Sequence, residues 1–543
     1  MTFTRREVLT AFLGAPLALA ACRRESSRRV LPPGEIVGTS VGIGHRLRDG
    51  WRPRPSDDAW KQVGVAIVGG GVAGLAAAWR LRRAGIDDFL VCELEPRAGG
   101  TARSGESAVT RFPWGAHYVP APTHENRTLV ALLGEMGLLD GIDAHGDPIV
   151  QEQALVRDPQ ERIFYRGTWY EGLYLHAGAS REDLRQFAEF RGIVNEWVAW
   201  RDRRGRRAFT IPVAGGSDDA EVTALDRISM RELLDRRGLT SPRLRWLVDY
   251  ACRDDYGSHP EQTSAWAGLF YFASRVPAAS AESEPLIAWP EGNGRFVEHF
   301  LQRIGARVAV STAVTEIVTA KNAIEVITAS ADGRRITGYR ARHVIFAAPQ
   351  FLVPRIIPAL PPERAAVAHE FTYGSWLVAN VALRDRLRER TFPLAWDNVF
   401  YESPSLGYVV ATHQLDRDRG PTVLTYYYAF CDADPVRART RMLSTGREEW
   451  ADVVLSDLGL AHPDIRELAT KLDIMRWGHA MVRPRPGFVW GPARREAAKP
   501  FEGIHFAHTD LSGVALFEEA LHHGVRAAEE ILADRGELSE TLL

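Results

Sequence analysis

The chain has 543 residues, of which 45% are hydrophobic and 25% charged, and its formal net charge is −2. This composition is typical of a globular protein that is long enough for two domains. The near-zero charge argues against a nucleic-acid partner, because binding to phosphates needs a clear excess of basic residues. The four scattered cysteines predict neither a disulfide framework nor a zinc site, and no histidine cluster has the spacing of metal ligands.

The first 22 residues predict a targeting segment. The apolar run from Val8 to Ala21 is too short to span a bilayer, and it follows the basic pair Arg5-Arg6. This pair resembles the twin-arginine signal of proteins that are exported already folded. The run ends at Cys22 in a sequence that resembles a bacterial lipobox, so Cys22 is the expected lipidation site. We therefore expect export to the periplasm and a lipid anchor in the inner or outer membrane, with residues 23–60 as a tether.

A βαβ unit is predicted from residue 61 onward. A buried apolar strand, a glycine turn, an Ala- and Leu-rich helix that ends at Gly85, and a second strand follow one another here. The turn has the pattern Gly69-x-Gly71-x-x-Gly74. In such a turn the first glycine permits the sharp reversal, the second lets the backbone approach a pyrophosphate, and the third allows close packing of helix and strand.

The helix after this turn adds a second binding feature. Its first residues, Val72 and Ala73, carry free backbone N–H groups at the positive end of the helix dipole, where a diphosphate binds. Glu93, at the end of the second strand, is placed to accept hydrogen bonds from ribose hydroxyls. Strand, turn, helix and acid together predict a dinucleotide-binding domain.

The residues that follow indicate which dinucleotide is bound. The run from Glu93 to Thr101 contains Arg97, Gly99 and Gly100, and it resembles the extended flavin signature of the superfamily of flavin-containing amine oxidases and phytoene desaturases. The resemblance continues, in the expected order, at residues 114–118, 291–317, 344–349 and 503–532. It implies an FAD-dependent oxidoreductase with FAD as the cofactor.

The same resemblance implies further contacts with FAD. The backbone near Val314 would lie against the adenine end, and Asp510 falls where relatives have an acid that bonds the ribityl chain. A helix that begins near residues 513–516 would point its positive end at the flavin ring. The remaining residues implied in FAD binding are Gly115, Ala116, His117, Val514 and Ala515.

The implied fold class is α/β, with a discontinuous Rossmann-type FAD-binding domain and an inserted α+β substrate domain. We assign residues 61–150, 286–370 and 486–543 to the FAD-binding domain, and residues 151–285 and 371–485 to the substrate domain. Residues 306–349 also predict alternating strands, with a turn at Asp332-Gly333.

One catalytic residue of the amine oxidases is missing. Relatives carry a lysine that holds a water against the flavin, but Val378 occupies this position here and none of the four lysines replaces it. Asn380, on the same face of the predicted strand, is the nearest polar substitute. Because that lysine is associated with reoxidation of the flavin by oxygen, we expect a dehydrogenase rather than a fast oxidase.

Other positions near the predicted flavin also differ from the relatives. His508 replaces a glycine of the closing motif, so its imidazole either lies near the cofactor or is satisfied by local backbone. Of the two aromatic rings that frame the amine in relatives, one is replaced by Leu516, and the other corresponds to Phe488 or Trp490. Alternatively, these aromatic residues only pack in the hydrophobic core. His508, Asn380 and Trp490 are thus the candidate catalytic residues.

Three functions remain open from the sequence. The first is oxidation of a small organic substrate, an amine, by loss of a hydride from the carbon next to nitrogen, with oxygen or a periplasmic carrier as the electron acceptor. The second is a desaturase or isomerase that acts on an apolar, polyene-like substrate. The third is a flavoprotein that binds a partner and has lost turnover. Bleaching of the flavin by a substrate would separate the third function from the other two.

Overall fold

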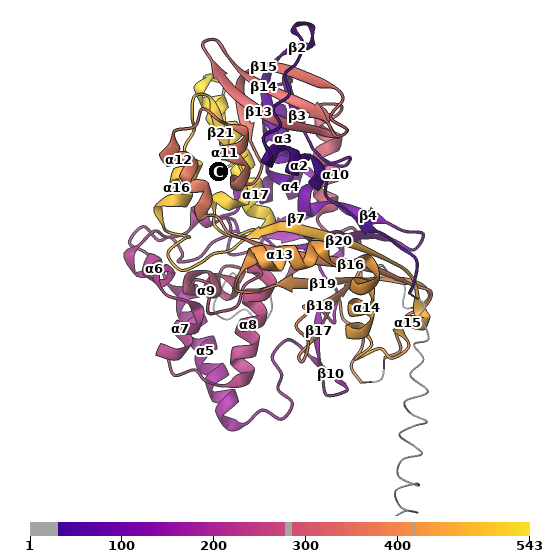
Figure 1. Cartoon of the computed structure of the whole chain (residues 1–543). Helices are drawn as coiled ribbons and strands as arrows, with labels where there is room; N and C mark the ends of the chain where they lie inside the picture. Colours follow the sequence, from indigo (N-terminus) through magenta and orange to yellow (C-terminus); the bar gives the residue numbers. More distant parts are fainter. Residues whose placement is uncertain (1–30, 277–284, 390, 416–418) are drawn as a thin grey trace, which may run out of the picture.

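The computed structural model describes residues 31–276, 285–389, 391–415 and 419–543. Within these residues lie two large β-sheets, one of seven strands and one of eight (Figure 1). The seven-stranded sheet and its helices lie at the top of Figure 1, and the eight-stranded sheet lies beneath them. The predicted α/β class, with a Rossmann-type domain and a second α+β domain, is confirmed.

The seven-stranded sheet has the order β12-β3-β2-β15-β14-β13, and β21 pairs with the second half of β15. β12, β3, β2, β15 and β21 run parallel, whereas β13, β14 and the first half of β15 form an antiparallel meander. The turn between β14 and β15 contains Asp332-Gly333, as predicted. The strands are β2 Trp60–Val68, β3 Phe89–Cys92, β12 Val308–Ala309, β13 Thr312–Ala320, β14 Ala323–Ser330, β15 Ile336–Phe346 and β21 Ile504–Phe506.

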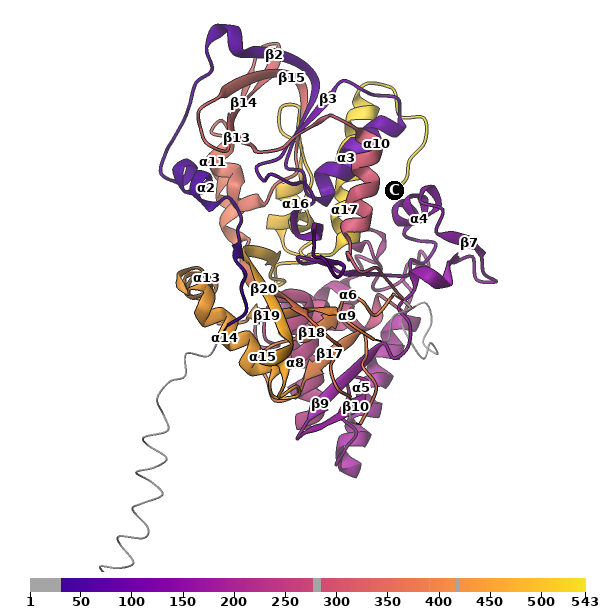
Figure 2. The ribbon, with the colours of Figure 1, turned by 90° about the vertical axis from the view of Figure 1, so that its right-hand side faces the viewer.

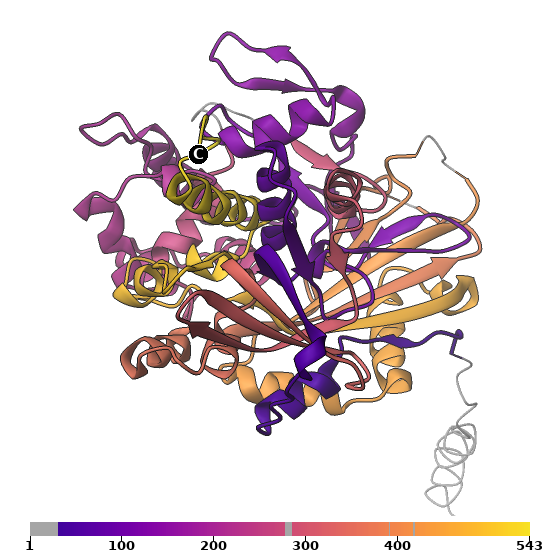
Figure 3. The same ribbon diagram turned by 90° about the horizontal axis from the view of Figure 1, so that it is seen from above.

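Two helices pack against each other beside the edge of this sheet where the cofactor is expected to bind. α3 (Val72–Arg83) follows β2, and α17 (Phe517–Asp534) follows β21. Because both strands are parallel to β15, both helices begin near the carboxyl edge of the sheet. A Cβ atom on Gly524 would collide with the carbonyl oxygen of Ala73, so this glycine allows the close contact. Figure 3 shows α17, in yellow, beside the indigo segment that contains α3.

The eight-stranded sheet combines strands from three separate segments of the chain, because β1 at residues 36–37 also belongs to it. Its order is β1-β20-β16-β19-β18-β17-β9-β10, so strands from residues 161–171 join strands from residues 373–482. One face packs on helices α13, α14 and α15, and the other face contacts residues 112–118 below the first sheet. The strands are β1 Ile36–Val37, β9 Glu161–Tyr165, β10 Thr168–Glu171, β16 Tyr373–Leu383, β17 Asp397–Phe400, β18 Gly407–Val410, β19 Thr422–Phe430 and β20 Ala469–Val482.

A lobe of helices between residues 181 and 273 completes the lower half of the molecule, as Figure 2 shows from the side. Smaller helices and short ribbons connect the parts. The helices are α2 Val41–Arg48, α4 Arg127–Glu135, α5 Arg181–Ala199, α6 Ala220–Ala224, α7 Met230–Arg236, α8 Pro242–Tyr256, α9 Ala265–Ala273, α10 Gly294–Ile304, α11 Val353–Ile356, α12 Pro362–Val367, α13 Pro435–Ser444, α14 Arg447–Leu458, α15 Ile465–Leu468 and α16 Pro492–Ala498. The ribbon strands are β4 Ser104–Glu106, β5 Arg111–Pro113, β6 Tyr118–Pro120, β7 Leu139–Ile142, β8 Pro148–Val150 and β11 Leu286–Ala288.

Part of the predicted tether is packed on the body. Ile36 and Val37 form β1, which pairs in parallel with Ile474 and Met475 of β20, and α2 follows. The predicted signal and Cys22 lie outside the described residues. Among the helices that the structure describes, none is long and apolar enough to cross a bilayer.

Candidate active site

The glycine turn between β2 and α3 has room for a diphosphate. Gly69 has a φ of 101°, and a Cβ atom on Gly74 would collide with the carbonyl oxygen of Gly69. A Cβ atom on Gly71, by contrast, would point into open space. No side chain caps the start of α3, so the N–H groups of Val72 and Ala73 face that space without a competing side chain. These residues fit the predicted pyrophosphate.

Glu93 is held rigidly at the end of β3. Its Oε2 accepts a hydrogen bond of 2.7 Å from the N–H of Gly70, and its Oε1 accepts one of 2.8 Å from the N–H of Glu95. Burial raises the pKa of Glu93, and the two N–H donors oppose this rise. The strand that carries Val314 begins beside Glu93, because the N–H of Thr312 donates to the carbonyl oxygen of Glu93 over 2.7 Å. Glu93 and Val314 therefore lie at the same end of the sheet.

Backbone hydrogen bonds join the glycine turn to two other predicted FAD segments. The N–H of Gly99 donates to the carbonyl oxygen of Gly70 over 2.7 Å, and the N–H of Ala116 donates to that of Thr101 over 2.9 Å. Gly99 and Gly100 both have a positive φ, of 120° and 56°. Thus the segments around residues 69–74, 97–101 and 115–117 lie side by side.

Arg103 is a buried residue near this site that the sequence analysis did not nominate. Its Nη1 lies 3.9 Å from Oε2 of Glu95, and its Nη2 lies 3.6 Å from Sδ of Met475 on β20. Arg97, which the resemblance implied, is exposed at the surface. The spacing Gly99-Gly100-x-x-Arg103 is the sequence signal from which Arg103 could have been found.

Asp510 lies in the interior, in the turn that precedes α17. Its Oδ2 accepts hydrogen bonds from the N–H of Gln350, at 2.8 Å, and from the hydroxyl of Tyr373, at 2.6 Å. Nδ1 of His508, a half-buried residue, lies 3.0 Å from Oδ1 of Asp510. Burial opposes the ionisation of Asp510, but the His508 charge and these hydrogen bonds lower its pKa below the usual value. Nδ1 of His508 also accepts a hydrogen bond of 3.2 Å from the backbone N–H of Asp510, so this ring nitrogen is engaged by local backbone.

The N-terminus of α17 is open toward the centre of the molecule. Leu516 precedes the helix and no side chain caps it, while Val514 is buried and Ala515 is half-buried in the turn before it. The helix begins at Phe517, next to the expected residues 513–516. Burial raises the pKa of Glu518, in the first turn, to about 8. Burial likewise raises the pKa of Glu519, also in the first turn, to about 7, so the two acids cancel less of the positive end of the helix dipole at pH 7 than ordinary glutamates would.

A buried apolar side chain occupies the strand position of the missing lysine. Val378 is buried on β16, opposite Tyr427 on β19. Nδ2 of Asn380 donates to the carbonyl oxygen of Pro113 over 3.1 Å, and its Oδ1 accepts from the hydroxyl of Thr425 over 2.7 Å. Both polar ends of the Asn380 amide are therefore engaged within the protein.

The aromatic residues proposed to frame a substrate lie in two different clusters. Phe488 packs edge-on against Phe371, with 5.1 Å between the ring centroids, in the core beside the seven-stranded sheet. Trp490 is half-buried, lies edge-on to Trp266 at 5.8 Å, and shares a cluster with Leu516. The ring of Phe488 also reaches the turn before α17, because a Cβ atom on Gly513 would lie 3.5 Å from it. The two aromatic residues therefore do not form a pair that frames one site.

Three carboxyl groups that sequence reasoning missed lie together in the substrate domain. Glu161 begins β9 and Asp397 begins β17, and the two residues are direct partners on neighbouring parallel strands. Burial and the charge of Asp254, on α8, raise the pKa of Glu161 to about 7. Burial and the charge of Asp255 raise that of Asp254 to about 7, and burial with the charges of Asp254 and Glu161 raises that of Asp397 well above its usual value. We call Glu161, Asp254 and Asp397 the acidic trio.

Among the residues that the structure describes, none of the three members of the acidic trio forms an ion pair, and each residue keeps some water-accessible surface. Asp255, the neighbour of Asp254, is paired with the buried Arg275 over 2.6 Å. The charges of Arg275 and Arg253 also act on Asp254 and oppose the rise of its pKa. The trio is therefore a group of closely spaced acids without a direct ion pair. Its members come from three distant segments, so no local sequence spacing could have indicated it.

Aromatic rings connect the acidic trio to the predicted flavin segment. The hydroxyl of Tyr427 donates to the carbonyl oxygen of Gly115 over 2.9 Å, and its ring stacks on that of His117 at 4.8 Å. His117 also lies 5.4 Å from the ring of Trp396, which precedes Asp397. Burial lowers the pKa of His117 to about 4, so this ring is neutral at pH 7. The trio thus lies beside residues 115–117 and the strand face of Val378.

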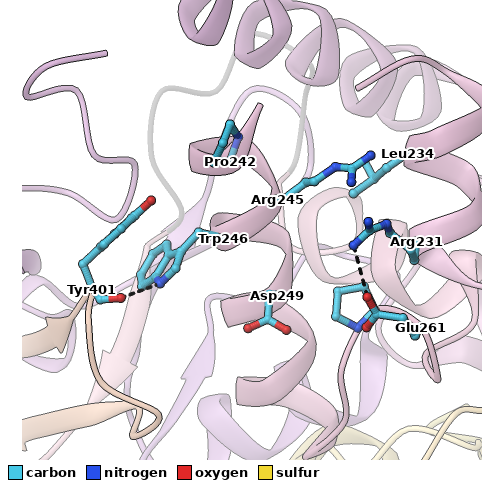
Figure 4. Close-up of a pocket in the computed structure, with 9 residues that line it drawn as sticks. Arg231, Leu234, Pro242, Arg245, Trp246, Asp249, Glu261 and Tyr401 are labelled. Carbon is cyan, nitrogen blue, oxygen red and sulfur yellow. Dashed lines mark hydrogen bonds and ion pairs between the residues drawn. The ribbon is translucent and has the colours of Figure 1, made fainter. Parts of the chain in front are cut away.

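A separate surface pocket lies between α7, α8 and the loop after β17 (Figure 4). Its lining includes the ion pair of Arg231 with Glu261, at 3.1 Å, and the hydrogen bond from Trp246 to the carbonyl oxygen of Tyr401, at 2.8 Å. None of the predicted cofactor residues lines this pocket, so it is not part of the site described above.

The fold and the nucleotide-binding turn define an FAD-dependent oxidoreductase. The model of the family described as flavin containing amine oxidoreductase matches residues 72–532, and the chain belongs to this family. It is 26% identical, over 87% of its own length and 97% of the relative's, to AofH of Mycobacterium tuberculosis, named as a flavin-containing monoamine oxidase.

Two solved structures show the same fold. A putrescine oxidase bound to putrescine is 17% identical with a TM-score of 0.65, and the match covers 87% of this chain and all of that one. A fatty acid isomerase from P. acnes that produces CLA is 14% identical with a TM-score of 0.61, and the match covers 87% of this chain and 98% of that one. The predicted FAD cofactor and enzyme class are confirmed by the family, whereas the roles of individual site residues stay predictions.

Proposed function

We propose that this protein oxidises an amine that carries a second positive charge, such as a diamine or polyamine. The observation that carries the proposal is the acidic trio, which is unpaired, partly accessible and next to the predicted flavin segment. A distant ammonium group would neutralise these like-charged carboxyls, which otherwise resist ionisation. The putrescine oxidase among the structural relatives supports this substrate class by analogy.

In this proposal each part of the chain has a distinct task. The residues around Gly71, Glu93 and Asp510 hold FAD, which when bound accepts a hydride from the carbon next to the reacting nitrogen. The acidic trio binds the distant ammonium group and so orients the substrate. The neutral rings of His117 and Tyr427 line the path between the two. The uncapped start of α17 stabilises negative charge that develops nearby.

We further propose a dehydrogenase that passes electrons to a carrier rather than rapidly to oxygen. Val378 replaces the lysine of the relatives, and the polar groups of Asn380 are already bonded to Pro113 and Thr425. Neither Val378 nor Asn380 is therefore free to hold a water in the way of that lysine.

The alternative, an isomerase or desaturase of an apolar substrate, fits the fold equally well, as the fatty acid isomerase illustrates. It fits the acidic trio poorly, because an apolar ligand would bury three carboxyls without a cation.

Anaerobic mixing of the FAD-loaded protein with diamines, polyamines, monoamines and a polyene tests these functions. We expect diamines or polyamines to bleach the flavin at the lowest concentrations, and we expect colour to return slowly in air. Bleaching by monoamines alone would overturn the role of the acidic trio. A change caused only by the polyene would favour the second function, and no change with any compound would favour a flavoprotein without turnover.

The same proposal includes the location of the enzyme. Arg5-Arg6 and Cys22 support export of the folded, FAD-loaded protein to the periplasm and attachment to a membrane by a lipid. A periplasmic location is consistent with an electron carrier as the acceptor.

A further inference from the structure

Three potential metal ligands from distant parts of the chain lie close together, two on the seven-stranded sheet and one on α17. His343 lies on β15, His505 lies on β21, and Asp534 is the last residue of α17. One ligand atom of each lies within 4.8 Å of the other two. The Nε2 atom of His505 is 3.8 Å from Oδ2 of Asp534, which is too long for a hydrogen bond.

Each of the two histidines has one buried nitrogen without a hydrogen-bond partner among the described residues. His505 is 3% exposed, and its Nε2 is buried without a hydrogen-bond partner among the described residues. Nδ1 of His343 is likewise buried and without one. Buried polar atoms nearly always have a partner, because leaving one unsatisfied costs about 1–3 kcal/mol. Two such nitrogen atoms and one carboxylate make a set of donor atoms that a metal ion can bind.

The other nitrogen of His505 is oriented as in known metal sites. Its Nδ1 lies 2.8 Å from Oε2 of Glu530, one turn before Asp534 on α17. When Nδ1 donates its proton to this carboxylate, the lone pair stays on Nε2 and faces the cluster. Arg526 forms an ion pair with Glu530 and so fixes the carboxylate. Histidine ligands of metals are usually supported by a carboxylate in this way.

We propose that His343, His505 and Asp534 bind one divalent transition metal ion, Zn²⁺, through Nδ1, Nε2 and a carboxylate oxygen. Two atoms bound tetrahedrally to one zinc ion lie about 3.4 Å apart, so the separations here need only small side-chain movements. Asp534 is exposed and free to make them. The C-terminal end of a helix also favours a cation. A water molecule takes the fourth position.

The zinc ion has a structural role in this proposal. It connects β15, β21 and the end of α17, which are separate in the sequence. Asp534 lies about 26 Å along α17 from the start of the helix, where the flavin is predicted. The ion would therefore hold the C-terminal helix on the sheet without touching the reacting atoms.

Metal analysis of the untagged, FAD-loaded protein tests this site. After treatment with a chelator, the protein is dialysed against Zn²⁺, and bound zinc is measured together with the titration heat. We expect one zinc ion per chain, and at least a tenfold weaker binding in Asp534→Asn, whose exposed side chain makes a folding defect improbable. We expect His343→Gln and His505→Gln to lose the ion. His124→Gln removes an exposed histidine elsewhere and is the matched control.

Thermal unfolding supplies a second readout. Zn²⁺ should raise the melting temperature of the wild type and of His124→Gln, because it binds only the folded state, and the same zinc concentration should raise that of Asp534→Asn less. Glu530→Gln should weaken zinc binding by about 10–100-fold. The proposal is overturned if the wild type and Asp534→Asn bind zinc equally, or if the wild type binds none. If His505→Gln does not fold, the comparison of zinc binding between the wild type and Asp534→Asn still tests the proposal.

Discussion

The hydroxyl of Tyr250 lies 3.3 Å from Oδ2 of Asp397 and donates its proton to that carboxylate. This contact is the one hydrogen bond from a side chain to the acidic trio that the described residues contain. Burial and the neighbouring acids still hold the pKa of Asp397 well above its usual value, so an ammonium group bound beside it would favour its charged form.

The variant Asp397→Asn tests this directly. We expect the KM for a diamine to rise at least tenfold, which corresponds to about 1.4 kcal/mol of lost attraction, while kcat changes little. The KM for a monoamine should change less, because a monoamine has no second charge. Glu171→Gln, at an exposed end of β10, is the control. An unchanged KM for diamines in Asp397→Asn would exclude the proposed role of the trio.

The acidic trio also predicts a pH dependence of substrate binding. Glu161 and Asp254 have pKa values of about 7, so their charge increases between pH 6 and pH 8, while an aliphatic amine stays protonated. Steady-state kinetics should therefore show that the KM for a diamine falls as the pH rises through this range. A KM that is flat from pH 6 to pH 8 would contradict the assignment.

The stability of the protein should fall as the pH rises, although substrate binding becomes stronger. The folded-state pKa values of Glu161 and Asp254 are raised above their unfolded values, so the stabilisation is complete below about pH 4 and is lost as the pH rises through 7. The contribution of these two groups should thus lower the melting temperature at pH 8 relative to pH 6. A diamine should raise the melting temperature more at pH 8 than at pH 6. In Glu161→Gln combined with Asp254→Asn, thermal melts should show a smaller difference between the two pH values.

Gly71→Ala separates FAD binding from folding. The added methyl group points into open space in the protein alone, so the apoprotein should fold normally. It would occupy the approach of the diphosphate, so the affinity for FAD, measured by flavin fluorescence, should fall at least tenfold. Gly192→Ala, in α5, meets equally open space away from the turn and serves as the control. Equal FAD affinity in both variants would refute the assigned place of the diphosphate.

Val378→Lys tests the dehydrogenase proposal. If the missing lysine limits the reaction with oxygen, reoxidation of the reduced enzyme in air should become at least tenfold faster in this variant. Val378→Met has a side chain of similar length without the charge, and it should behave like the wild type. Rapid reoxidation of the wild type itself, in stopped-flow measurements, would show that this enzyme does not depend on that lysine.

Local sequence patterns predicted the nucleotide-binding half of the molecule well. The strand, turn and helix around Gly71 follow from periodicity and glycine spacing, whereas the start of α17 was expected, within a few residues, from the family resemblance. These features depend on neighbours in the sequence, which a pattern can represent. The family resemblance added FAD, which the local chemistry alone did not specify.

The remaining site depends on contacts between distant segments. Glu161 and Asp397 meet only because β9 and β17 pair in parallel, and Asp254 approaches them from a helix. Asn380 was expected to face the flavin as a polar substitute, but its partner Thr425 lies on another strand and could not be found from the sequence. For the same reason, the sequence analysis did not find the cluster of His343, His505 and Asp534.

Fractionation of cells tests the proposed location. Replacing Arg5-Arg6 by two lysines should leave the FAD-loaded protein in the cytoplasm, because the export pathway reads the arginine pair. Cys22→Ala should still be exported but should move from the membrane fraction to the soluble periplasm, because the lipid is lost. A Cys22→Ala protein that stays with the membrane would rule out a lipid anchor at this residue.

The pairing of β1 with β20 determines which side of an anchored enzyme faces the bilayer. β1 is an edge strand of the eight-stranded sheet, so a chain that leads back to Cys22 departs from the substrate domain rather than from the FAD-binding domain. Between Cys22 and Ile36 a fully extended chain reaches at most about 50 Å. A lipid at Cys22 would thus keep the enzyme within about one molecular diameter of the headgroups. Diffusion of substrates and electron carriers would then take place along a surface as well as through the bulk solution.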